Sequence, residues 1–301
     1  MEIRKLIKPV RAAIEHNSDK NWWRILLIWI GVMVVRYGIM VLLVATISSN
    51  QLRAQVPDCK QSLRGEKEIL RYKVRWGFIR LGTVVLTQEP FNEQTVKMRM
   101  EVHSAEGLPF INVHFTNESI KNLDSPALFL ETITSGRDTS ERSVFLYESD
   151  LSKILMQDYA DGKIRRSDSL QCDRACFDAL GLLMLSRLLV FDQRSLTVPT
   201  LNDYSIGETE LRFTGLTECV RTPAFNTAVR CRRVDGTANW IGKTFAGMQG
   251  PFTGYFSDNS AAVPIRAEVK IFLGSIVLEL ESFERAGWNQ ETTFVSVGDH
   301  R

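Results

Sequence analysis

An alternation of basic and apolar residues in the segment RYKVRW, at positions 71–76, predicts a β-strand with one buried face. A period of two places the two aromatic residues and the valine on one side of the strand and the basic residues on the other. Gly77 and Gly82 then bracket a bend, after which residues 83–87 continue as a second strand. Glycine suits such a position, because a side chain would clash where the backbone bends sharply.

Similar patterns recur along the chain, with one helical interruption. A helical period appears over residues 173–191, and residues 192–199 end it. No repeat or low-complexity linker divides residues 60–285, so we expect one domain that is mainly β (β-rich α+β). Further strands are expected at 95–104, 119–123, 128–135, 141–147, 153–158, 209–216, 228–234, 254–257, 265–271 and 275–282.

An almost continuous apolar run from Trp22 to Ser48 predicts that the rest of the chain is exported. The basic segment 1–21 precedes it, and a basic flank keeps an N-terminus in the cytoplasm. In one interpretation Arg36 closes the basic part of a signal peptide, and a peptidase cuts near Ala54. We therefore divide the chain into a cytoplasmic segment 1–21, an export segment 22–55 and an exported domain 56–301.

The second interpretation is a signal-anchor helix that stays in the membrane. The run from Trp22 to Ser48 has 27 residues, which exceeds the roughly 20 that span a bilayer core. Arg36 would cost about 2.5–3.5 kcal/mol near the middle of such a helix, a cost that the surrounding apolar residues can absorb. The expected location is therefore the periplasm or cell envelope, with the domain either soluble or tethered.

The charge distribution gives little support to nucleic-acid binding. Residues 1–55 hold eight Lys/Arg and three Asp/Glu, a net charge of +5, so the total of +2 leaves −3 for residues 56–301. No basic stripe with interleaved aromatic residues remains in the domain. His103 and His114 are interpreted as ordinary strand residues, and we expect neither a metal site nor a cofactor.

Two pairs of cysteines are candidates for disulfides, because an exported domain meets an oxidising compartment. Cys219 and Cys231 flank a turn-like segment, and a hairpin centred near Phe225 would bring them face to face. Cys172 and Cys176 have helical spacing, although a disulfide there needs an irregular first turn. A metal site at the second pair would need two further ligands. Cys59 has no lipidation motif before it.

Two blocks of sequence resemble a bacterial family of exported domains of unknown function, numbered 3108. The first block is GEKEILRYKVRWGFIRLGT at 65–83, and the second comprises FSDN at 256–259, VPIRAE at 263–268 and LGSI at 273–276. The resemblance covers about residues 64–283. It implies a long curved antiparallel sheet or half-barrel around one central helix, with no catalytic residues to carry over. The extra cysteines depart from the cysteine-poor pattern of the family and look like a local stabilising addition.

The function expected from these observations is non-catalytic binding or carriage of an apolar ligand such as a lipid, because a curved sheet over a helix can enclose an apolar groove. The alternative is a membrane-tethered assembly protein that contacts other envelope proteins through an exposed patch. A hydrolase has the least support, because no serine-nucleophile elbow, Ser-His-Asp set or metal motif is present. The candidate ligand-binding residues are Trp76, Phe78, Phe252, Tyr255 and Phe256.

Overall fold

The computed structural model describes residues 59–288, except for 109–111, 126, 128, 136–140, 148–152, 173, 203 and 240–249. The predicted export segment, including Trp22, Arg36, Ser48 and Ala54, lies outside this part of the chain. None of the helices among the described residues is long and apolar enough to cross a membrane.

The described residues form one antiparallel sheet of 14 strands and two helices, which confirms the prediction of a mainly β fold. The helices are α3 (Cys59–Arg64) and α4 (Ala179–Leu189). The strands are β1 (Glu68–Trp76), β2 (Ile79–Pro90), β3 (Thr95–Ser104), β4 (His114–Asn122), β5 (Phe129–Ser135), β6 (Glu141–Tyr147), β7 (Lys153–Ala160), β8 (Lys163–Gln171), β9 (Arg194–Asn202), β10 (Ser205–Val220), β11 (Val229–Asn239), β12 (Gly250–Ser257), β13 (Pro264–Lys270) and β14 (Ser275–Arg285).

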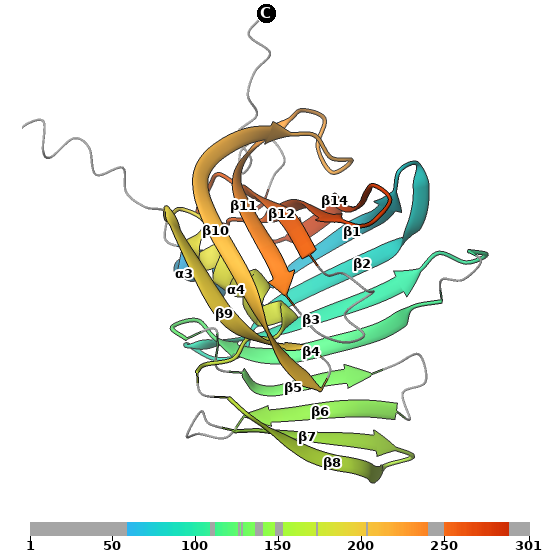
Figure 1. Ribbon diagram of the computed structural model, residues 1–301. Coiled ribbons are helices and arrows are strands. Elements are labelled where there is room, and N and C mark those ends of the chain that lie inside the picture. Colours follow the sequence, from blue (N-terminus) through green and yellow to red (C-terminus); the bar gives the residue numbers. More distant parts are fainter. Residues whose placement is uncertain are drawn as a thin grey trace, which may run out of the picture. The chain divides into compact units, whose positions relative to one another are not determined.

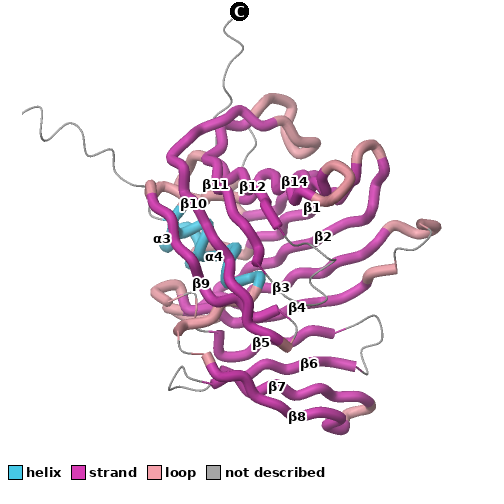
Figure 2. Tube along the Cα trace, in the orientation of Figure 1, coloured by secondary structure: helices cyan, strands magenta, loops and turns pink. Residues whose placement is uncertain are grey.

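The chain builds this sheet in two meanders that meet at its middle. Strands β1 to β8 pair in sequence, the chain then passes through α4, and β9 to β14 pair in sequence until β14 joins β1. The free edges are therefore β8 and β9, and the sheet is not closed by pairing between them. Figure 1 shows the sheet curling so that β9–β12 lie in front of α4 while β2–β4 pass behind it, and Figure 2 marks both helices in cyan within the curl.

The sequence patterns did not predict two of the strands, β8 and β9. Every residue of β8 is exposed except the half-buried Leu170, so the strand carries no alternation to read. Strand β9 lies where the sequence predicts only the end of a helix, and it contains Pro199. Proline is tolerated there because β9 is an edge strand, where a missing N–H breaks no ladder bond.

Burial of one face explains the elements that the patterns did predict. In β1, Leu70 and Tyr72 are buried and Arg71 between them is exposed. In α4, Leu180 and Met184 lie one turn apart and are both buried. Residues three or four apart share a helix face, so these side chains face the sheet.

Gly82 is required by the close approach of β3 to β2. It lies opposite Ser104 in the register, and a Cβ at this position would collide with the backbone carbonyl of His103. A glycine therefore lets the two strands stay paired as far as their shared end.

Residues Pro57–Arg301 form a compact unit with a core of their own. The largest cluster of buried side chains joins α4 to the inner faces of β1–β3 and β14, and a second joins α4 to β9–β12. Because the described residues of this unit supply two buried clusters, we expect it to fold on its own.

The tip of the β9–β10 hairpin rests on β6–β8. Leu201 joins a small buried cluster with Phe145, Ile154 and Met156. The hydroxyl of Tyr204 donates to the Asp158 carboxylate at 2.8 Å. This contact brings the two ends of the curled sheet together without a strand ladder.

Candidate functional site

An apolar cavity of about 240 Å³ lies between α4 and the inner face of β10–β13. Apart from Ser186, the described residues of its lining are apolar residues and glycines. Helix α4 forms one wall, and four neighbouring strands form the other. The lining residues are Ala179, Leu182, Leu183, Ser186, Leu211, Val234, Ala238, Gly250, Phe252, Gly254, Phe256, Ala267 and Val269.

The register of the strands explains why a space is left here. Val234 lies opposite Gly254, which lies opposite Ala267, so small residues occupy the centre of the wall. One row along, Phe252 lies opposite Gly236, and a Cβ at Gly236 would collide with the Phe252 ring. The ring is therefore packed against the neighbouring backbone, and the cavity remains beside it.

The N-terminus of α4 is fixed by a buried ion pair. Asp178 caps the helix by accepting a hydrogen bond from the Gly181 N–H at 2.6 Å. The same carboxylate pairs at 2.7 Å with the ammonium of Lys121 on β4, and both side chains are buried. Burial lowers the pKa of Lys121, and the nearby Asp178 opposes this effect. A cap of this kind ties the start of the helix to one place on the sheet.

A second buried ion pair fixes the other end of α4. Both terminal nitrogens of the Arg187 guanidinium donate to the Glu68 carboxylate of β1, at 2.8 and 3.1 Å. Arg187 also donates to the Ala261 carbonyl at 2.8 Å and to Gln88 Oε1 at 3.3 Å. Burial disfavours the charge of Arg187, but the Glu68 carboxylate outweighs it and the pKa of the guanidinium is raised. The side chain carries its charge deep in the core, surrounded by acceptors.

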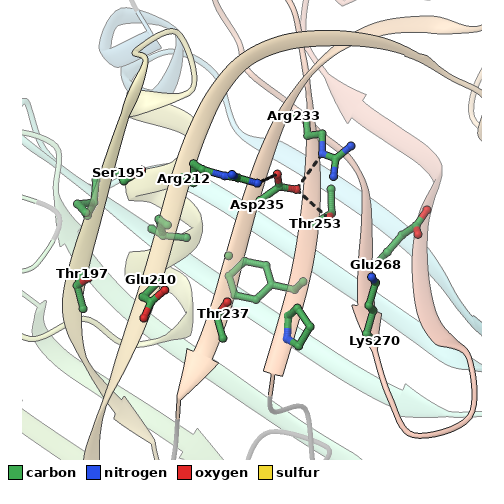
Figure 3. Close-up of a pocket in the computed structure, with 15 residues that line it drawn as sticks. Ser195, Thr197, Glu210, Arg212, Arg233, Asp235, Thr237, Thr253, Glu268 and Lys270 are labelled. Carbon is green, nitrogen blue, oxygen red and sulfur yellow. Dashed lines mark hydrogen bonds and ion pairs between the residues drawn. The ribbon is translucent and has the colours of Figure 1, made fainter.

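A larger hollow of about 630 Å³ lies on the opposite face of β9–β13. Figure 3 shows that its wall carries charged side chains that bond to one another. Asp235 accepts from Arg212 and Arg233, both at 2.8 Å, and from Thr253 at 3.1 Å. Burial opposes the charge of Asp235, yet these hydrogen bonds prevail and its pKa is lowered. Because these charges already have partners within the wall, the inner cavity is the better candidate for a ligand site.

The two histidines treated as unrelated in the sequence face each other across β3 and β4. His103 lies opposite His114, and their Nδ1 atoms are 3.4 Å apart on the exposed surface. The available signal for this pairing was their short spacing of 11 positions, which suits residues on adjacent strands. Within the described residues no group of three or more His, Cys, Asp or Glu side chains is placed to hold a metal ion.

The predicted disulfide between Cys219 and Cys231 is wrong for this structure, in which both thiols are free. Cys219 lies opposite Arg230, and Cys231 lies opposite Glu218. The hairpin is centred between Ala224 and Phe225 rather than on Phe225. Neighbouring residues of a strand point to opposite faces, so this half-residue offset separates the two cysteines: Cys231 is buried and Cys219 is exposed.

Cys172 and Cys176 are also free thiols, and both belong to the same small buried cluster. Both are buried in the non-helical segment between β8 and α4, not on a helix face as their spacing suggested. The Cys172 thiol donates to the Arg174 carbonyl at 2.7 Å. Burial raises the pKa of Cys176, and its hydrogen bond with Cys172 adds to the effect.

The predicted ligand-binding aromatic residues fall into separate places. Phe252 and Phe256 line the inner cavity. Tyr255 lies between them in β12, opposite Arg233 and Arg266, and so faces the other side of the sheet. Trp76 and Phe78 lie at the turn that joins β1 to β2, away from the cavity lining.

Charged residues inside the core were missed by the sequence patterns. Arg187 occurs seven positions after Leu180 and three after Met184, so it falls on the apolar face of α4. A basic residue in an apolar helical stripe was the available signal for the ion pair with Glu68.

Comparison with known proteins supports the fold and places the chain in a family. A crystal structure of a β-barrel-like protein of the domain of unknown function DUF1849, from Brucella abortus, is similar with a TM-score of 0.50 and 8% sequence identity. The similarity covers 75% of this chain and 100% of that one. No curated protein matches the chain. The sequence profile of one family matches residues 71–281, and the chain therefore belongs to the family described as protein of unknown function (DUF3108).

Proposed function

We propose that this chain is an exported envelope protein whose β-rich domain binds and carries an apolar ligand such as a lipid, without catalysing a reaction. The observation that carries the proposal is the apolar cavity between α4 and β10–β13. Ligand sites of proteins are typically concave and lined mainly by apolar and aromatic side chains.

The size of the cavity favours a slender ligand. Its volume of about 240 Å³ lies just below the roughly 300–1,000 Å³ of sites for drug-sized molecules. A single acyl chain, or part of one, fits such a space better than a bulky ring system. The Phe252 and Phe256 rings would contact one side of the acyl chain.

The lining also favours binding over catalysis. Ser186 is the hydroxyl residue of the lining, and its Oγ donates to the Leu182 carbonyl at 2.8 Å, one helical turn before it. None of the described lining residues carries a carboxylate, imidazole or amine that could act as a base toward this hydroxyl. An assembly protein acting through contacts alone would need no such space in its core, so the carrier is preferred over that alternative.

The proposal is tested by filling the cavity. Ala267→Phe places a ring in the wall of the cavity, whereas Glu268→Phe places the same ring on the opposite face of β13 as a control. We expect Ala267→Phe to weaken binding of a fluorescent fatty acid by about tenfold or more, because displacing only two buried methylenes costs that much. Binding is titrated by fluorescence, and urea unfolding checks that each variant is folded.

Native mass spectrometry gives a second test of the same idea. The chain from Pro57 onward, purified from an envelope-bearing host, is expected to carry an additional mass that organic extraction removes. A bare protein mass, together with a fatty-acid affinity that Ala267→Phe leaves unchanged, would refute the carrier proposal.

A further inference from the structure

Two neighbouring turns at one end of the sheet present apolar side chains directly to solvent. Phe78, in the β1–β2 turn, is 98% exposed, and Phe272, in the β13–β14 turn, is also 98% exposed. Leu273 beside it is 63% exposed. We call Trp76, Phe78, Phe272 and Leu273 the apolar tip.

The two turns are joined to each other, so the apolar tip is a single surface. The indole N–H of Trp76 donates to the Leu273 carbonyl at 2.6 Å, which links the β1–β2 turn to the β13–β14 turn. Figure 1 shows the two turns, in blue and in red, side by side at the same end of the sheet. Gly77 and Gly274 adopt positive φ angles of 55° and 85°, which lets both turns reverse tightly and keeps their apexes narrow.

A row of apolar side chains connects the apolar tip with the cavity. Directly opposite residues of neighbouring strands point to the same face of a sheet. The register places Phe252 opposite Val269, Val269 opposite Ile276, and Ile276 opposite Trp76. Phe252 and Val269 line the cavity. The inner face of the sheet is therefore apolar along the whole path from the cavity wall to the tip.

We propose that the apolar tip inserts into the surface of a lipid bilayer and that the row from Trp76 to Phe252 is the path by which the carried chain enters or leaves the cavity. This inference rests on the proposed function, since it names the partner from which the ligand comes. Tryptophan and phenylalanine are suited to the interface of a membrane, where an apolar ring is buried and a polar group stays solvated. Lys270, exposed at the end of β13, lies beside the tip where phosphate groups of lipids would be.

A bilayer fits this surface better than a protein partner does. The apolar side chains stand at two narrow apexes, whereas a binding hot spot on a protein is a packed patch surrounded by a rim that excludes water. The apolar row behind the tip also leads to a cavity suited to an acyl chain, and a bilayer is the source of such chains. The two observations point to the same occupant.

The test uses the chain from Pro57 onward, which lacks the apolar segment that would itself bind membranes, and vesicles of phosphatidylcholine or of phosphatidylglycerol. The double variant Phe78→Ala/Phe272→Ala removes both apexes. Phe91→Ala is the matched control, because Phe91 is 59% exposed in the β2–β3 turn at the opposite end of β2. We expect the double variant to lower the vesicle partition coefficient by about tenfold or more, and the control to leave it unchanged.

A fatty-acid titration in solution, without vesicles, separates this inference from the proposed function. The double variant is expected to bind the fatty acid as the original chain does, while losing vesicle binding and transfer of fluorescent lipid between vesicles. Failure of the original chain to float with vesicles of either composition, or equal flotation of the double variant, would overturn the inference even if the fatty acid binds. Flotation that depends on the tip, in a chain that binds no fatty acid, would keep the inference and refute the carrier.

Discussion

Buried ion pairs join α4 to the sheet, whereas β6–β8 are joined to the rest of the molecule by the β5–β6 ladder, a small apolar cluster and exposed polar contacts. Arg187 and Lys121 are 0% exposed and bind carboxylates on other elements. At the far edge, the Arg174–Glu208 pair that joins the β8–α4 segment to β10 has side chains 60% and 56% exposed. An ion pair in the core opens only when the core opens, while an exposed pair opens locally. We therefore expect β6–β8 to separate from the hairpin tip of β9–β10 well before α4 leaves the sheet.

The largest loss of folding stability should come from removing one buried charge. Arg187→Ala leaves Glu68 buried without its main partner, and loss of one member of a buried pair costs about 3–5 kcal/mol. Arg174→Ala is the control at the far edge, where a surface pair contributes about 0–1 kcal/mol. Urea unfolding followed by circular dichroism measures both, and similar losses in the two variants would contradict the contrast between the regions.

An intermediate effect is expected where the two regions meet. Cys172 and Cys176 lie between β8 and α4 and belong to the same small buried cluster. Oxidation to a disulfide would close a loop of five residues and stabilise the unit by about 2 kcal/mol on the chain-entropy account. Because burial raises the pKa of Cys176, oxidation at neutral pH should be slow without a thiol–disulfide oxidoreductase.

Alkylation and mass spectrometry with and without reductant would identify this bond after expression in an oxidising compartment. Cys219 and Cys231 serve as the internal control, because they point to opposite faces of their hairpin and should remain alkylable thiols. A chain that leaves Cys172 and Cys176 both reduced under these conditions would contradict the prediction.

The smallest loss of stability should be confined to the contact between the β9–β10 hairpin and β6–β8. Tyr204→Phe removes the hydroxyl that bonds to Asp158 at the tip of the β9–β10 hairpin, a loss of about 0.5–1.5 kcal/mol. Hydrogen exchange should quicken in β6–β8 and stay unchanged in α4. Tyr159→Phe is the matched control, since the Tyr159 hydroxyl donates to Gln157 within the same strand, β7. Faster exchange in α4 would show that the two regions open together.

Patterns in the sequence were reliable where one face of an element is buried and the other is solvated. The alternation in β1 is of this kind, because Leu70 and Tyr72 enter the core while Arg71 stays outside. Strand β8 has almost no buried face, so its sequence shows no alternation of apolar and polar residues. Its nine residues are extended because they pair with β7.

The candidate site was predicted only in part, for a different physical reason. Phe252 and Phe256 were recognised as aromatic residues of a strand, but the cavity beside them depends on small residues such as Gly254 and Ala267 in neighbouring strands. Which residues lie opposite one another is decided by the register, and a shift of half a residue at the Cys219–Cys231 hairpin was enough to reverse a prediction.

The pairing of β1 with β14 has a consequence for the order in which the molecule assembles. Glu68 on β1 is 217 positions from Arg285 on β14, to which it bonds. Synthesis proceeds from the N-terminus, so β1 is made before β14 but keeps one edge unpaired until that last strand is made. Contacts this distant in sequence form slowly, and an unpaired edge is a template for aggregation. The nascent chain should therefore depend on a chaperone that covers β1 until β14 has been synthesised.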